Sequence, residues 1–303
     1  MTPAEVLLRV ENYDLAATLE SGQVFRWQRQ NESWFGVVGQ NYVRLTQTAG
    51  GIVAETSAGM DAMNRLRDFL QIDTDLAAVL KTFPDDKPMR AAVAACPGLR
   101  LLRQDPWECL ASFILSSTKQ IVQIRQIVSL LCERFGEPCG GVPAERRKTV
   151  LTDKCGLLPK AATPALPVAF PSPQRIASLT EAELRACKMG FRAPNLLGAA
   201  REIAEGRFDL ERIRQFPHAM ARAELMKLRG VGGKIADCVL LFAYGFDSAF
   251  PVDVWVERAL QQLYFPRRRA SEQRLRRFAA THFGPHAGYA QQYLFHYIRT
   301  KLN

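Results

Sequence analysis

The sequence is poor in the residues that hold metal ions. Its 303 residues include four histidines and seven cysteines, and no two cysteines form a Cys-x-x-Cys pair. His282 and His286 have the i,i+4 spacing of a helical metal site, but Gly284 and Pro285 between them interrupt the helix that would align them. No cysteine follows Cys238, so a C-terminal cysteine cluster is excluded. We therefore expect no cofactor, neither zinc nor an iron–sulfur cluster.

Long apolar runs are also absent. No stretch approaches the roughly 20 apolar residues of a membrane-spanning helix, and residues 1–14 carry acids where a signal peptide has a basic flank. The seven cysteines are an odd number and form no close pairs, which indicates reduced thiols rather than disulfides. Because 48% of the residues are apolar, the chain predicts a soluble intracellular protein with a substantial core and no membrane contact.

Acidic residues are scarce in the C-terminal half. The chain carries 40 Lys and Arg against 30 Asp and Glu, and the excess is uneven. Residues 1–60 have four bases and six acids, whereas 185–235 have 11 bases to five acids and 266–303 have eight to one. A localised basic surface suits a polyanion, and nucleic acid is the commonest polyanion inside cells.

The hydrophobic pattern changes along the chain from strand-like to helical. Short segments rich in aromatic and β-branched residues predict an antiparallel meander, with strands at 24–28, 33–39 and 42–48. Helical periodicity follows at 60–70 and 74–81, and from Asp105 it dominates nearly to the end.

This change predicts an α+β fold in two units. An N-terminal α+β domain at 1–104 carries an antiparallel β-sheet with helices, and the body at 105–303 is all-helical. Five prolines within 159–173 cannot lie inside a helix, so they predict a surface connection that divides the body. The sequence contains no internal repeat.

The segment 228–246 has the pattern of two helices joined by a glycine-rich hairpin. The hairpin holds Gly230, Gly232 and Gly233, and the second helix starts at about Lys234. Glycine lets the backbone approach a ligand, and the free N–H groups at the start of a helix suit a phosphate. Such a site would hold a DNA backbone without reading its sequence. On its own, however, the pattern is more often an ordinary turn between packed helices.

An aspartate follows the hairpin at the start of the next predicted helix. Asp253 lies in the segment FPVDV, where alone it would be a plain N-cap. The hairpin with Lys234 followed by Pro-Val-Asp is similar to the signature of the helix-hairpin-helix DNA glycosylase superfamily. A lysine at this position marks the bifunctional branch of that superfamily. The endonuclease III relatives in that branch carry a four-cysteine iron–sulfur cluster, which this sequence lacks.

The sequence resembles 8-oxoguanine DNA glycosylases over almost its whole length. The matching blocks keep the family's order: SGQVFRW at 21–27, LTQT at 45–48, DPWECLASFILSS at 105–117, MGFRA at 189–193, the hairpin at 230–238, PVDVW at 251–255 and HAGYAQQYLF at 286–295. The resemblance implies a base excision repair enzyme with glycosylase and abasic-site lyase activities. It also implies a monomer whose partner is double-stranded DNA containing 8-oxoguanine.

The resemblance assigns roles to residues at the expected active site. Lys234 would be the nucleophile that expels the base and then nicks the strand through an imine, and Asp253 would stabilise the charge that develops on the sugar.

Four further residues would bind the extruded base. Phe295 would stack on the base opposite Cys238, and Gln291 would hydrogen-bond its Watson–Crick edge. The carbonyl of Gly22 would accept the N7 hydrogen that distinguishes 8-oxoguanine from guanine. Without the resemblance, Phe295 and Cys238 would be core residues and Gln291 a solvated side chain.

A second set of residues would contact the DNA around the extruded nucleotide. Phe191 matches an aromatic wedge in the stack, and Arg192 matches an arginine directed at the orphaned partner base. Thr118 and Gln123 stand where the animal and fungal pattern has an Asn and an Arg, and Trp255 stands where it has a His. These departures predict a bacterial member, located in the cytoplasm or nucleoid, with loose recognition of the opposite cytosine.

Two other functions compete with this one. An alkylpurine DNA glycosylase on the same fold would need no lysine nucleophile, so Lys234 argues against it. A non-catalytic DNA-binding module would have no reason to place Asp253 beside that lysine. The sequence leaves open a cation bound by backbone carbonyls of the hairpin, because no side-chain spacing reports on one.

Overall fold

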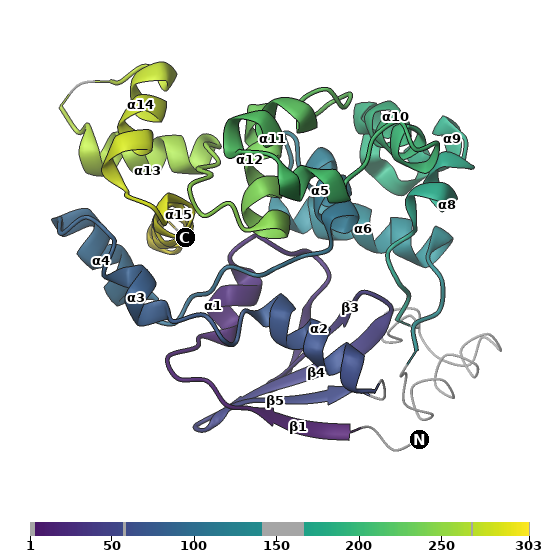
Figure 1. Ribbon diagram of the computed structural model, residues 1–303, viewed down its shortest axis with the longest axis horizontal. Helices are drawn as coiled ribbons and strands as arrows, with labels where there is room; N and C mark the ends of the chain where they lie inside the picture. Colours follow the sequence, from purple (N-terminus) through teal and green to yellow (C-terminus); the bar gives the residue numbers. More distant parts are fainter. Residues whose placement is uncertain (1–3, 57–58, 141–166, 268, 303) are drawn as a thin grey trace.

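The computed structural model describes residues 4–56, 59–140, 167–267 and 269–302, and it places a β-sheet beneath a helical body (Figure 1). One antiparallel sheet has the strand order β1-β5-β4-β3-β2. Its strands are β1 (Ala4–Leu8), β2 (Gln28–Gln30), β3 (Ser33–Val38), β4 (Asn41–Thr48) and β5 (Gly51–Thr56).

One face of the sheet forms its own small core. Trp34, Leu45 and Ala54 are register partners across β3, β4 and β5, and all three are buried. The helix α2 (Met60–Leu70) belongs to the same core through residues that include Phe69. A slip of one residue would turn these three apolar side chains away from the core, so their burial fixes the register.

Two of the three predicted strands are confirmed as β3 and β4, but the predicted strand at 24–28 is wrong. Only Gln28 of that segment lies in a strand. Phe25 belongs to the core of the helical body, whereas Trp27 stacks on Phe69 in the core of the sheet, with ring centroids 5.9 Å apart. The alternating apolar residues therefore fill two separate cores rather than one face of a sheet.

The helical body is confirmed. Its helices are α5 (Pro106–Leu115), α6 (Ile121–Phe135), α8 (Pro173–Ala177), α9 (Glu181–Leu184), η1 (Arg185–Met189), η2 (Gly190–Arg192), α10 (Ala193–Ala204), η3 (Glu211–Gln215), α11 (His218–Leu225), α12 (Gly233–Val239), η4 (Leu240–Tyr244), α13 (Val254–Tyr264), α14 (Glu272–His282) and α15 (Ala287–Leu302). One continuous apolar core joins most of them.

Two helices from the N-terminal part of the chain also pack on this body. The predicted helices at 60–70 and 74–81 are confirmed as α2 and α3 (Leu76–Leu80), whereas α1 (Leu15–Glu20) and α4 (Lys87–Ala95) were not predicted. The buried residues of α3 and α4 lie in the core of the helical body, and α4 contacts α15.

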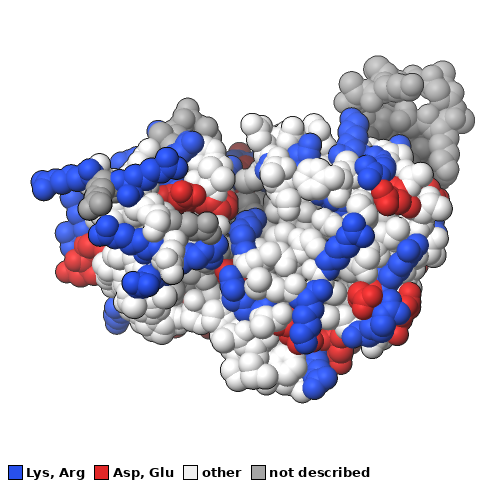
Figure 2. Space-filling view, turned by 90° about the horizontal axis from the view of Figure 1, so that it is seen from above, with Lys and Arg blue, Asp and Glu red and all other residues white. Residues whose placement is uncertain are grey.

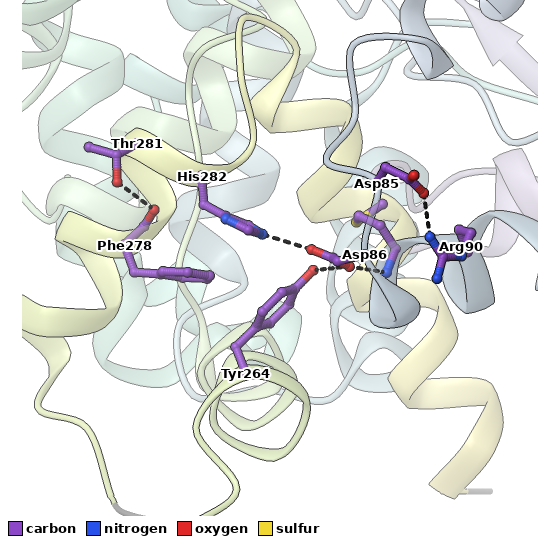
Figure 3. Close-up of polar contacts among 8 residues, drawn as sticks. Asp85, Asp86, Arg90, Tyr264, Phe278, Thr281 and His282 are labelled. Carbon is purple, nitrogen blue, oxygen red and sulfur yellow. Dashed lines mark hydrogen bonds and ion pairs between the residues drawn. The ribbon is translucent and has the colours of Figure 1, made fainter.

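Asp86, the N-cap of α4, ties this helix to the C-terminal helices (Figure 3). Its carboxylate accepts hydrogen bonds from the Met89 amide at 2.8 Å, the Tyr264 hydroxyl at 3.2 Å and His282 Nε2 at 2.7 Å. His282 also stacks on Phe278, with ring centroids 4.4 Å apart. The carboxylate thus caps one helix and holds two others.

The predicted proline-rich connection at 159–173 falls outside the described residues up to residue 166. Its described end joins the helical body, because Val168 forms an isolated bridge with Pro138 and Pro173 begins α8. Proline suits this first helical position because its missing N–H would have no partner there. Among the described residues, no helix combines the length and apolarity needed to cross a bilayer.

Candidate active site and nucleic-acid interface

The predicted hairpin lies between α11 and α12. Gly230 has φ of +81°, and a Cβ there would come within 2.6 Å of the Asn195 side chain, so both the backbone conformation and the contact require glycine. Gly232 is the N-cap of α12 in an extended conformation, and Gly233 is the first residue of the helix. The free N–H groups at this helix start are the groups that a phosphate would meet.

Lys234 follows in the first turn of α12 and points into the helical body. Its Nζ donates to Ser116 Oγ at 3.3 Å and lies 5.0 Å from the centroid of the Phe113 ring. Neither partner was predicted as a site residue, although both lie in the matched block at 105–117. An aromatic face and a hydroxyl hold the amine in place.

A small cavity brings the predicted catalytic and base-binding residues together. Its volume is about 50 Å³, and its lining residues come from five separate parts of the chain: Gly22, Phe113, Lys234, Cys238, Phe242, Pro251, Asp253, Gln291, Gln292 and Phe295. All six residues predicted to act on the sugar or to bind the base are in this set.

Asp253 lies at the N-terminus of α13, as predicted. Its Oδ1 accepts a hydrogen bond from the Val256 amide at 2.8 Å, so it is an N-cap. Within the described residues its other oxygen makes no hydrogen bond, and the residue also lines the cavity with Lys234. The cap therefore occupies one oxygen and leaves the second for the ligand.

The walls of the cavity are suited to a flat, polar ring. Cys238 is buried, and burial raises the pKa of its thiol to about 12, so it presents a neutral sulfur. Phe295 contributes an aromatic ring from α15. Gln291, one turn earlier, is 3% exposed, and its Oε1 has no hydrogen-bond partner among the described residues. A buried amide oxygen without a partner costs free energy that a ligand donor would recover.

The loop at 21–23 brings Gly22 to this wall. Gly22 has φ of +82°, and a Cβ there would lie 2.8 Å from Ile121 Cδ1 and 3.3 Å from Phe295 Cε1. The Gln292 amide on α15 donates to the Ser21 carbonyl at 2.8 Å and so fixes the loop to the helix. Gln292 was not given a role from the sequence, because its partner lies 271 residues away in the chain.

The residues predicted to contact the DNA stack do not line this cavity. Phe191 is 58% exposed, and the Arg192 guanidinium lies 4.2 Å from its ring centroid. Arg192 itself is buried and donates to the Ser117 carbonyl at 2.8 Å and to Thr118 Oγ1 at 2.6 Å. Thr118 has φ of +56°, a strained conformation for a non-glycine residue.

Two other predicted residues are used within the protein. Gln123 Oε1 accepts from the Gln120 amide at 3.3 Å in the capping box of α6. Trp255 lies beneath the Arg258 guanidinium, which is 5.0 Å from its ring centroid, and it does not line the cavity.

Basic side chains gather over α13 and α14, at the left of Figure 2. This distribution agrees with the excess of Lys and Arg in residues 266–303 of the sequence. Within the described residues, no group of three or more His, Cys, Asp or Glu side chains is arranged to hold a metal ion.

The fold and this site define a helix-hairpin-helix DNA repair protein, since residues 111–284 match the HhH-GPD superfamily of base excision DNA repair proteins. Residues 5–110 match the N-terminal domain of 8-oxoguanine DNA glycosylases. The chain belongs to this 8-oxoguanine DNA glycosylase family of the superfamily.

Named relatives are similar over most of the chain. The probable N-glycosylase/DNA lyase of Methanothermobacter thermautotrophicus is 33% identical over 72% of this chain and 69% of its own length. The N-glycosylase/DNA lyase of Saccharomyces cerevisiae is 30% identical over 82% of this chain and 68% of its own length. Among solved structures, the 8-oxoguanine glycosylase/lyase of Clostridium acetobutylicum bound to double-stranded DNA has a TM-score of 0.85 and 29% identity, covering 100% of this chain and 99% of that one.

Proposed function

We propose that this protein removes 8-oxoguanine from duplex DNA and then nicks the strand at the resulting site. The observation that carries the proposal is the shared cavity, in which Lys234, Asp253 and the four base-binding residues meet. Membership of the family supports the same activity. An alkylpurine DNA glycosylase would not need the lysine, and a non-catalytic module would not need a carboxylate facing it.

Lys234 supplies the nucleophile. Its neutral Nζ attacks C1′ of the damaged nucleotide, a C1′–N bond forms, and the glycosidic bond breaks with its electron pair leaving on the base. The free carboxylate oxygen of Asp253 stabilises the positive charge that develops on the sugar. Opening of the sugar ring gives an imine to Lys234, loss of a C2′ proton follows, and the 3′ phosphate leaves by β-elimination.

The base-binding residues select the damaged base. Phe295 and the neutral Cys238 thiol hold the extruded ring between them, and Gln291 pairs with its Watson–Crick edge. The Gly22 carbonyl accepts the N7 hydrogen of 8-oxoguanine, whereas guanine presents a lone pair there. In a dry pocket that unpaired acceptor costs enough to reject guanine by a few kcal/mol.

The hairpin and the wedge hold the DNA. Gly230, Gly232 and Gly233 bring backbone N–H groups to a phosphate. Phe191 is exposed and fills the space that the extruded nucleotide leaves in the stack. The DNA around this wedge would meet Arg192, Thr118, Gln123 and Trp255. We infer a monomer that works in the cytoplasm or nucleoid without a cofactor.

Borohydride trapping tests the proposal. Reduction of the imine should link the protein covalently to DNA that contains one 8-oxoguanine, and the adduct should map to Lys234. The Lys234→Gln variant should bind this DNA but form no adduct and no nick. An adduct that persists in this variant, or a wild-type protein that forms none, contradicts the assignment.

A further inference from the structure

Two arginines without a role lie beside the base pocket. Arg299 on α15 stacks over Phe295, with its Cζ 5.1 Å from the ring centroid. Its Nη1 lies 3.6 Å from the position that a Cβ of Gly22 would occupy, so the guanidinium reaches the loop that lines the pocket. Arg125 on α6 is close enough for its charge to act on Arg299. The two cations come from different helices, and Arg125 lines a separate, larger cavity together with Glu20.

Neither guanidinium has a hydrogen-bond or carboxylate partner within the described residues. Arg125 Nε is buried without a hydrogen bond, and no ion pair within 4.0 Å involves either side chain. Burial lowers the pKa of Arg299, and Arg125 adds to this shift, while Asp253 and Glu20 oppose it from beyond ion-pair distance. Holding two positive charges close together, partly buried and without a counter-charge, costs free energy. Binding of an anion would lower this cost.

Other arginines at comparable depth are hydrogen-bonded within the protein, some to carboxylates and some, such as Arg192, to a carbonyl. Arg26 contacts Glu108 at 3.2 Å, and Arg222 contacts Asp237 at 2.6 Å. Those pairs are complete within the protein, so they have no charge left for a ligand. Arg125 and Arg299 differ from these arginines in having no such partner among the described residues.

We propose that Arg125 and Arg299 together bind one phosphate of the damaged strand beside the extruded nucleotide. The proposal rests on the function proposed above, because a nucleotide whose base enters this pocket must carry its flanking phosphates past the pocket edge. Guanidinium groups bind phosphate through paired, charge-assisted hydrogen bonds. The site forms a contact only when a nucleotide is extruded, so it favours damaged over intact DNA.

Binding measurements on a stable abasic analogue test the proposal without requiring catalysis. Arg299→Gln and Arg125→Gln should each weaken binding to a duplex with one tetrahydrofuran site by about tenfold, the effect of one lost charged hydrogen bond. Binding to the undamaged duplex should stay unchanged. Arg267→Gln is the matched control, because this exposed arginine lies away from the pocket and should weaken binding to both duplexes equally.

Neutral methylphosphonate linkages identify the phosphate. The phosphates next to the tetrahydrofuran site are replaced one at a time. One of these replacements should weaken binding by the wild type. The same replacement should not weaken binding by the Arg125→Gln/Arg299→Gln double variant. Equal sensitivity of both proteins at every linkage overturns the proposal. So does equal weakening of damaged and undamaged binding by either single variant.

Three further outcomes separate this proposal from others. If the variants bind the analogue like the wild type while borohydride trapping persists, the arginine site is wrong and the proposed function stands. If the wild type forms no adduct, the proposed function itself fails. Inorganic phosphate, added at constant ionic strength, tests for a free anion as the ligand. The ligand is the free anion rather than DNA if phosphate raises the midpoint of thermal unfolding of the wild type but not of the double variant, and if the double variant still prefers the analogue.

Discussion

At the residue scale, Asp253 combines a structural task with a chemical one. Its Oδ1 caps α13 through the Val256 amide, and the same side chain lines the cavity that holds Lys234. An asparagine at this position retains an oxygen for the cap but carries no charge. An alanine loses both. Two substitutions therefore separate the cap from the electrostatic role.

Asp253→Asn should slow base release by two to three orders of magnitude, or about 3–4 kcal/mol, because it removes the charge that stabilises the transition state. Its free energy of unfolding should stay close to that of the wild type. Asp253→Ala should also lose about 1 kcal/mol of stability with the cap. Single-turnover release of 8-oxoguanine and urea unfolding measure the two effects. Wild-type release by the asparagine variant would leave Asp253 as a cap alone.

Arg192 is also committed to contacts within the protein. Its guanidinium donates to the Ser117 carbonyl and to Thr118 Oγ1, and Gln123 closes a capping box. Reading an orphaned cytosine would require Arg192 to exchange these partners. The Thr118 hydroxyl is short and the Gln123 amide is neutral. Neither side chain should therefore distinguish cytosine strongly from another base.

Excision of 8-oxoguanine opposite adenine, guanine or thymine should therefore approach the rate opposite cytosine. Each missing base contact should remove about 1–3 kcal/mol of discrimination. Gln123→Arg should sharpen the preference for cytosine by supplying a charged donor. Single-turnover rates on the four pairings measure this preference. A wild-type preference of several hundredfold for cytosine would mean that other residues read the opposite base.

At the element scale, the position of α12 depends on a buried ion pair. Asp237 on this helix is 4% exposed and accepts from Arg222 on α11 at 2.6 Å. Burial raises the pKa of Asp237, and the Arg222 guanidinium counteracts this shift. The same guanidinium contacts Gly233, the first residue of the helix that carries Lys234. The pair thus joins both helices of the hairpin next to the nucleophile.

Asp237→Asn should lower the free energy of unfolding by about 2 kcal/mol, because it leaves the partly buried Arg222 without its counter-charge. The rate of borohydride trapping at saturating DNA should fall as well, since the first turn of α12 loses its support. Glu211→Gln, which removes an exposed ion pair with Arg214, is the control and should change stability by less than about 1 kcal/mol. Equal effects of the two substitutions would contradict this role for the pair.

The sequence predicted the elements whose signals are local. The hairpin glycines, the aspartate before α13 and the i,i+4 pair of Gln291 and Phe295 all follow from spacing within one segment. The segment containing Phe25 and Trp27 was misassigned as a strand because its alternate residues face two cores, which spacing does not reveal. The partners of Lys234 and the position of Arg299 were missed for a related reason, because they depend on contacts between distant parts of the chain.

At the scale of the whole molecule, the base pocket joins the two parts of the chain. Lys234 and Asp253 come from the helical body, whereas Gly22 comes from the N-terminal part. The buried Gln23 side chain holds that loop through the carbonyls of Thr18 and Arg100, at 3.0 and 2.8 Å. In the proposed function, the residue that recognises the base and the residues that act on the sugar are therefore held by different parts of the chain. A substitution where these parts meet should affect one activity more than the other.

Gln292 lies where these parts meet, because its buried amide donates to the Ser21 carbonyl directly before Gly22. Gln292→Leu keeps most of the side-chain volume but removes the donor, and the unpaired carbonyl should cost about 1–3 kcal/mol of stability. The loosened loop should slow release of 8-oxoguanine by tenfold or more, the effect of about 1.4 kcal/mol on a barrier. In the proposed mechanism, nicking of a preformed abasic site uses only Lys234 and Asp253, so its rate should stay near that of the wild type. Parallel single-turnover measurements on the two substrates compare these rates directly, and an equal fall in both would show that Gln292 supports the whole site rather than base recognition.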